Sequence, residues 1–265
     1  MKNFEQSTEQ LKTIDQDWEK LQQNEVISRL ADGENLQTII ESLPDIQERF
    51  CELDTIDCSD GRVLNGRKIG IAGSGLLLNK EDRLKLIKQC RGKKVTTHRD
   101  CGAAAKKFST LFPEEIPAGV ETADQYGTYC GQQLAEDLNS EHQFIELDQM
   151  ANKYHNELAI ILDATGQFDS THLEQLPPHF VCSGAALGFN EEYLKSELQI
   201  LAGISLGDHG FGKRFTTSTP FYIWVAANDQ EDLAIWKKLT QEVAKDFKGR
   251  VKTTGFVRPI DPDKN

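Results

Sequence analysis

Apolar and polar residues along the chain follow two patterns, one typical of helices and one typical of strands. Apolar positions three or four residues apart predict amphipathic helices. These lie within residues 4–50, where two helices are expected, and over residues 81–89, 102–108, 119–138, 191–204 and 229–247. Short β-capable runs predict strands over residues 50–56, 68–73, 93–97, 144–147, 158–162, 179–183, 221–225 and 251–257.

Strands that alternate with helices in this way predict an α/β fold, a central and mostly parallel β-sheet flanked by helices. The run at residues 158–162 is apolar throughout, as expected for a strand covered on both faces. Residues 1–48 are expected to form a helical arm that packs on the body of the chain or on a second subunit. Residues 49–265 are expected to form one domain, with a C-terminal extension from about residue 170. No internal repeat is visible in the sequence.

The composition limits the possible partners. The 265 residues carry 42 acidic and 30 basic side chains, a net charge of −12. Nucleic acids and anionic membranes are bound by clustered Lys and Arg, so neither is expected as a partner. There is no membrane-length apolar run of about 18–20 residues and no signal-peptide core near the first residues. We therefore expect a cytoplasmic protein whose six cysteines are thiols or metal ligands rather than disulfides.

Two short motifs place metal-ligating residues directly after predicted strands. The sequence CSDGR covers residues 58–62, and HRDCG covers residues 98–102. Cys58, His98 and Cys101 are three ligands that suit zinc, and three protein ligands leave one tetrahedral position open for water or substrate. Functional groups of open α/β sheets collect at the carboxyl ends of the strands, so we expect the two motifs to meet there.

Asp60 and Arg62 are the candidate catalytic pair of the first motif. Their spacing of two places both side chains on one side of an extended stretch, where the guanidinium would keep the carboxylate ionised. An ionised Asp60 would orient the hydroxide that a bound zinc makes available near neutral pH. Alternatively, Asp60 ligates the metal and closes the site, or the two residues form a purely structural ion pair.

These motifs resemble those of the β-class carbonic anhydrases, which carry Cys-x-Asp-x-Arg and His-x-x-Cys-Gly. The resemblance covers residues 50–110 and extends to LDATG at residues 162–166. It implies that Cys58, His98 and Cys101 bind one Zn²⁺ per chain and that Asp60 and Arg62 orient the fourth ligand. The implied reaction is the reversible hydration of CO2 to bicarbonate by zinc-bound hydroxide. The implied assembly is a homodimer or a multiple of it, with the helical arm embracing the partner.

Other readings of the site stay open at this point. The same site would serve a hydrolase of CS2 or COS, or hold zinc in an assembly module without turnover, and cobalt or cadmium would also suit the ligands.

The glycines of GIAGSG at residues 70–75 lack the spacing of a dinucleotide-binding motif. Among the remaining histidines, His209 is the candidate proton shuttle. The other histidines are expected to be ordinary surface or packed residues (His142, His155, His172 and His179). The other cysteines are expected to be small buried residues (Cys51, Cys90, Cys130 and Cys182).

Overall fold

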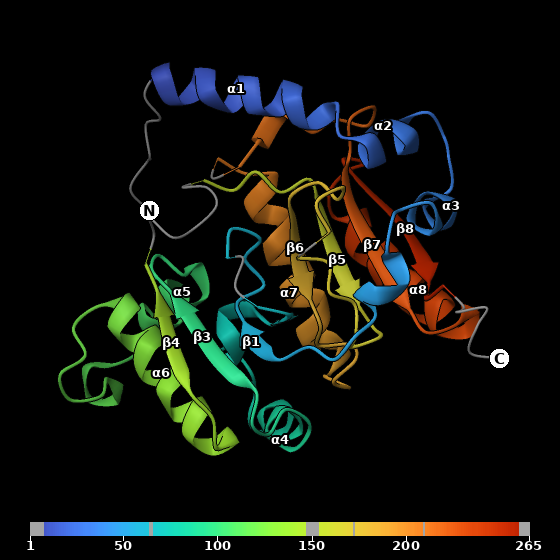
Figure 1. The fold of residues 1–265 in the computed structure, drawn as a ribbon. Coiled ribbons are helices and arrows are strands. Elements are labelled where there is room, and N and C mark those ends of the chain that lie inside the picture. Colours follow the sequence, from blue (N-terminus) through green and yellow to red (C-terminus); the bar gives the residue numbers. More distant parts are fainter. Residues whose placement is uncertain (1–7, 64–65, 147–153, 172, 209, 260–265) are drawn as a thin grey trace.

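The computed structural model describes residues 8–63, 66–146, 154–171, 173–208 and 210–259, in which helices and strands alternate (Figure 1). The α-helices are α1 (Thr8–Gln22), α2 (Glu25–Ala31), α3 (Leu36–Glu41), α4 (Lys80–Gln89), α5 (Gly102–Phe108), α6 (Ala123–Leu138), α7 (Glu191–Ser205) and α8 (Gln230–Lys245). The strands are β1 (Thr55–Asp57), β2 (Lys68–Gly70), β3 (Lys94–His98), β4 (His142–Ile145), β5 (Ala159–Asp163), β6 (His179–Cys182), β7 (Phe221–Ala227) and β8 (Val251–Val257). None of the helices in these ranges combines the length and the apolar character that a membrane span requires.

The strands form two four-stranded sheets in which every paired strand is parallel to its neighbour. Helices flank the sheets, so the predicted α/β class is confirmed (Figure 1). The first sheet has the order β2-β1-β3-β4, and the second has the order β6-β5-β7-β8. In each, the first strand along the chain lies between the second and the third, with the fourth at the edge. We call the part with β1–β4 the first half and the part with β5–β8 the second half. They share a topology that the sequence does not reveal as a repeat.

The two sheets meet edge to edge, with β2 beside β6. The Ser183 N–H donates to the Gly70 carbonyl at 2.8 Å, and the Gly70 N–H donates to the Ser183 hydroxyl at 3.1 Å. Nearby, the Val181 N–H donates to the Ser59 carbonyl at 3.1 Å. A Cβ on Gly70 would lie 2.2 Å from the Val181 carbonyl oxygen. The absence of a side chain at residue 70 therefore allows the backbones of the two halves to touch.

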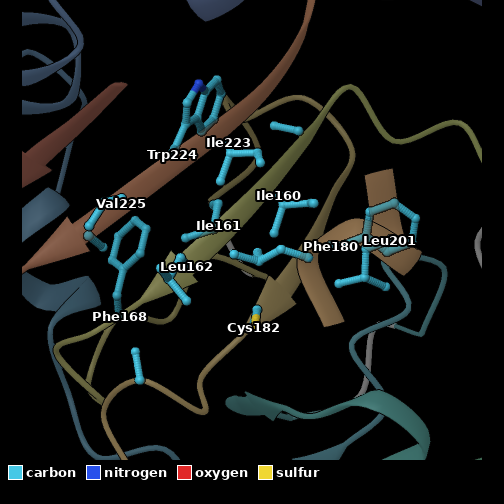
Figure 2. Close-up of a cluster of buried hydrophobic side chains, with 14 of the residues drawn as sticks. Ile160, Ile161, Leu162, Phe168, Phe180, Cys182, Leu201, Ile223, Trp224 and Val225 are labelled. Carbon is cyan, nitrogen blue, oxygen red and sulfur yellow. The ribbon is translucent and has the colours of Figure 1, made fainter. Parts of the chain in front are cut away.

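Figure 2 shows the core around β5, the strand next to both β6 and β7 in the second sheet. Every residue of β5 is buried, which explains its continuous apolar run. Phe180 of β6 and Trp224 of β7 are also fully buried beside it. The residues after about position 170 thus supply three strands of the second sheet.

The N-terminal helices pack on the second half of their own chain. Trp18 of α1 lies edge-on to both Phe211 and Phe215, with ring centroids 5.0 Å apart in each case. Gln37 of α3 exchanges two hydrogen bonds with the backbone of Val257 in β8. Ile39, also in α3, is fully buried. The narrow apolar stripes of the arm are thus covered within one chain.

We predict that Gly70→Ala lowers the free energy of unfolding by about 1–3 kcal/mol, the usual cost of overpacking a closed site. The new methyl group would meet backbone, which cannot rotate away as a side chain can. Gly203→Ala is the matched control, because a Cβ there meets nothing within 4 Å and α7 gains a better helix former. Urea unfolding measures both variants. Equal midpoints for Gly70→Ala and the unaltered chain would contradict the close approach of the two sheets.

Candidate metal centre between the two halves

The two motifs meet at the carboxyl edge of the first sheet. Cys58 follows β1 directly, and His98 is the last residue of β3. Because β1 and β3 are parallel neighbours, their carboxyl ends lie side by side. Cys101 is the N-cap of α5, and Asp100 before it has a left-handed conformation (φ 57°), as in a tight turn. The sequence therefore places all three predicted ligands at one edge.

Cys58, His98 and Cys101 are arranged as ligands of one ion. Their ligand atoms all lie within 4.8 Å of one another, and the three residues are buried. The two sulfur atoms are 3.9 Å apart, close to the roughly 3.8 Å expected for two thiolates on one tetrahedral ion with bonds of about 2.3 Å. His98 Nδ1 donates to the Arg99 carbonyl at 2.9 Å, which orients the ring. His98 Nε2 is buried without a hydrogen-bond partner among the described residues, so these side chains could hold a metal ion.

Without a metal, the three groups divide their protons unequally. Cys101 lowers the pKa of the Cys58 thiol well below its usual value, although burial opposes this. Cys58 and burial together raise the pKa of Cys101 well above the usual range, against the backbone N–H groups of α5. Burial lowers the pKa of His98, but the neighbouring Cys58 and Asp60 outweigh it and raise it to about 9. The metal-free cluster is then a thiolate, a thiol and an imidazolium, and a cation would displace the last two protons.

Asp60 and Arg62 form a buried ion pair beside these ligands. Arg62 Nη2 donates to Asp60 Oδ2 at 2.7 Å, and Nε donates to Oδ1 at 3.0 Å, so the contact is bidentate. Asp60 Oδ2 also lies 3.9 Å from His98 Nε2. Burial alone would raise the pKa of Asp60, but Arg62 and nearby histidines hold it well below its ordinary value. The carboxylate is therefore ionised at neutral pH and faces the metal ligands.

Lys68 of β2 fixes the turn that carries the ion pair. It is 1 % exposed. Its ammonium donates to the Asp60 carbonyl at 2.6 Å and to the Val63 carbonyl at 3.4 Å. The sequence gives little sign of this role, because a lysine at the start of a strand is usually solvated.

Glu197 of α7 ties the second half to the backbone around Cys58. It is 2 % exposed and accepts hydrogen bonds of 2.6 Å from both the Ser59 hydroxyl and the Ala72 N–H. Ser59 follows Cys58, and Ala72 precedes Gly73, whose N–H donates to the Cys58 sulfur at 3.3 Å. Sequence spacing gives no sign of Glu197, because its two partners lie 138 and 125 positions away along the chain.

The remaining histidines and cysteines lie in varied surroundings. His155 is grouped with Asp60 and Glu157, with one ligand atom of each within 4.8 Å of the others. His142 is hydrogen-bonded to Thr97, and His179 to Pro177 and Ser170, whereas His172 and His209 lie outside the described residues. All six cysteines are free. Of the four expected to be buried, Cys90 and Cys182 are, but Cys51 and Cys130 are half-buried because they lie nearer the surface.

A small cavity of about 10 Å³ adjoins the ligands, enough for about one water molecule. It is bounded by Gly73, Ser74, Leu76, Thr97, His98, Cys101, Ala104 and Gly127. Much of this wall is apolar or bears no side chain. The space beside the candidate metal position is therefore narrow and poorly hydrated.

Known proteins do not identify this site. Comparisons with protein-family models, with curated proteins and with solved structures gave no match. Any function assigned to this site therefore rests on the geometry and chemistry of its residues.

We predict that zinc binding near pH 8 releases at least two protons, one from His98 and one from Cys101, with a further release as the coordinated water ionises. This pH is below the pKa of His98, which is about 9, and below the pKa of Cys101, which is raised well above its usual value. Both side chains therefore carry a proton before zinc binds. Calorimetric titration in buffers of different ionisation enthalpy measures the number. Cys130→Ser, away from the ligands, should behave like the unaltered chain. Zinc binding without proton release would contradict the ligand assignment.

We also predict that Glu197→Ala lowers zinc affinity by about 10- to 100-fold, the usual range for residues that position metal ligands. The loss follows because Ser59 and Ala72 would no longer be held beside Cys58. Competition with a chromophoric chelator measures the affinity of the folded fraction. Glu242→Ala, which removes only a surface pair with Lys195, is the control. A Glu197→Ala variant that unfolds more easily but binds zinc as tightly would limit Glu197 to a role in stability.

Proposed function

We propose that this chain is a zinc-dependent carbonic anhydrase that interconverts CO2 and bicarbonate. The observation that carries the proposal is the buried, ionised Asp60, held by Arg62 at 3.9 Å from His98 Nε2. A purely structural metal site needs a fourth protein ligand and has no use for a carboxylate fixed in this way. Two thiols and one imidazole suit zinc and leave a tetrahedral position free.

When bound, zinc would lower the pKa of a coordinated water to about 7, so that hydroxide is available near neutral pH. The residues of the chain would supply the orientation. An ionised Asp60 can only accept hydrogen bonds, so it would take one from a water or hydroxide beside His98. Arg62 holds the carboxylate by two parallel hydrogen bonds, which restricts the direction from which it accepts.

The surroundings favour a small, uncharged substrate. The cavity beside His98 and Cys101 measures about 10 Å³ and is bounded in part by Leu76, Ala104 and Gly127. As whole residues, the ligands and the ion pair are each at most 7 % exposed. Exclusion of water strengthens the electrostatic effect of the ionised carboxylate. A nonpolar gas such as CO2 suits these conditions.

Two alternatives give way to this proposal on specific grounds. CS2 and COS are linear like CO2 but carry larger sulfur atoms, so they would need the wall of the roughly 10 Å³ cavity to move further than CO2 would. An assembly module without turnover would account for a metal site, but not for the buried pair of Asp60 and Arg62.

We propose a cytoplasmic location, where the six free cysteines stay reduced.

Within one chain, the second half already contributes Glu197 beside the ligands. The homodimer implied by the resemblance stays a prediction, which sedimentation velocity would test.

We predict that Asp60→Asn retains zinc but lowers kcat/KM for CO2 hydration by about a hundredfold or more. The neutral amide is a weaker acceptor and loses the bidentate contact with Arg62. Stopped-flow hydration assays on zinc-loaded protein measure the change. Asp137→Asn is the control, because it alters only a partly exposed pair with Arg83.

Two results would contradict the proposal. A zinc-loaded, folded chain that hydrates CO2 no faster than buffer would favour the assembly module. Hydrolysis of COS or CS2 without hydration of CO2 would favour that substrate class instead.

A further inference from the structure

His155 brings a second imidazole close to Asp60. Its Nδ1 donates to the Glu157 carboxylate, at 3.2 Å to Oε2 and 3.4 Å to Oε1. One ligand atom from each of Asp60, His155 and Glu157 lies within 4.8 Å of the other two. Asp60 therefore has two imidazoles near its carboxylate, that of His98, a predicted ligand, and that of His155.

This second group is poorly suited to a metal ion. Both oxygens of Asp60 already accept hydrogen bonds from the Arg62 guanidinium. A divalent cation bound there would lie close to that fixed positive charge and would be repelled by it. An imidazole backed by a carboxylate is, in contrast, a common arrangement for taking up and releasing a proton.

His155 also reaches closer to solvent than the rest of the site. The side chains of Asp60 and His98 are 8 % and 1 % exposed, whereas that of His155 is 14 % exposed. Glu157 behind it is completely buried. The hydrogen bond to Glu157 occupies Nδ1 and fixes the tautomer, so Nε2 carries the lone pair that can accept a proton.

The charges around His155 suit this exchange. Its ring packs against Phe180, with centroids 5.6 Å apart. Burial lowers the pKa of His155, but the Glu157 carboxylate and Asp60 outweigh burial and the opposing charge of Arg62, and the pKa lies above the ordinary 6.5. The buried Glu157 carboxylate thus stabilises the imidazolium form of His155.

We propose that His155 is the proton-relay residue of the site, an inference that rests on the function proposed above. Hydration of CO2 by one water gives bicarbonate and one proton. Neutral His155 takes that proton at Nε2, becomes an imidazolium and passes the proton to buffer, which restores the neutral ring. Dehydration of bicarbonate uses the reverse sequence. The sequence pointed to His209 for this role; the structure places His155 beside Asp60.

The test compares His155→Ala and His155→Gln with the unaltered zinc-loaded chain in stopped-flow hydration at low and high buffer concentration. We expect kcat in dilute buffer to fall about tenfold or more, while kcat/KM changes less than about twofold. Added imidazole should restore kcat. Asp137→Asn is the control, because it alters only a partly exposed pair with Arg83.

A second readout does not depend on activity. In NMR titrations of the zinc-free chain, the resonance lost in His155→Ala should have a pKa that falls in Glu157→Gln. Unchanged kcat in both His155 variants of an active enzyme would overturn the relay and leave the proposed function intact. Equal losses in kcat and kcat/KM without rescue would overturn it in favour of a positioning role. An inactive but zinc-loaded unaltered chain would overturn the proposed function and the relay with it.

Discussion

The close approach of the two sheets is the constraint on which the rest of the structure depends. A Cβ on Gly61 or on Gly70 would lie 2.2 Å from a carbonyl oxygen of β6. Gly61 lies between Asp60 and Arg62 in the sequence, so its close contact with β6 also buries the ion pair of these two residues. The second half then adds Glu197 beside Ser59, and His155 with the Glu157 carboxylate beside Asp60. First-half ligands thus form a site whose burial and charge depend on the second half.

The two halves share a strand order but not a site. Asp57 ends β1 and Asp163 ends β5, and burial raises the pKa of both to about 6. The next residue is Cys58 in the first half but Ala164 in the second. The second half has therefore no cysteine at the position that corresponds to the first ligand. Its contribution is a sheet edge, a helix and the His155 segment, all directed toward the first half.

Periodicity and local motifs predict much of this molecule, because they depend on neighbours along the chain. The helix expected over residues 229–247 is α8 (Gln230–Lys245), and the strand expected over residues 221–225 begins β7 (Phe221–Ala227). The five motif residues come together because each follows or ends a strand of one sheet. The division into two sheets was not predictable, since it depends on backbone contact across β2 and β6. The same holds for Glu197, because hydrogen bonds over more than a hundred positions leave no trace in spacing.

In the proposed function, one zinc ion held by Cys58, His98 and Cys101 makes this chain a CO2 hydratase. The decisive experiment is a titration of zinc into the metal-free protein, with the CO2 hydration rate followed at each step. We expect a rate that rises in proportion to bound zinc and reaches its plateau at one ion per chain. A folded chain that binds one zinc ion while hydration stays at the rate of buffer alone would rule out the proposed function.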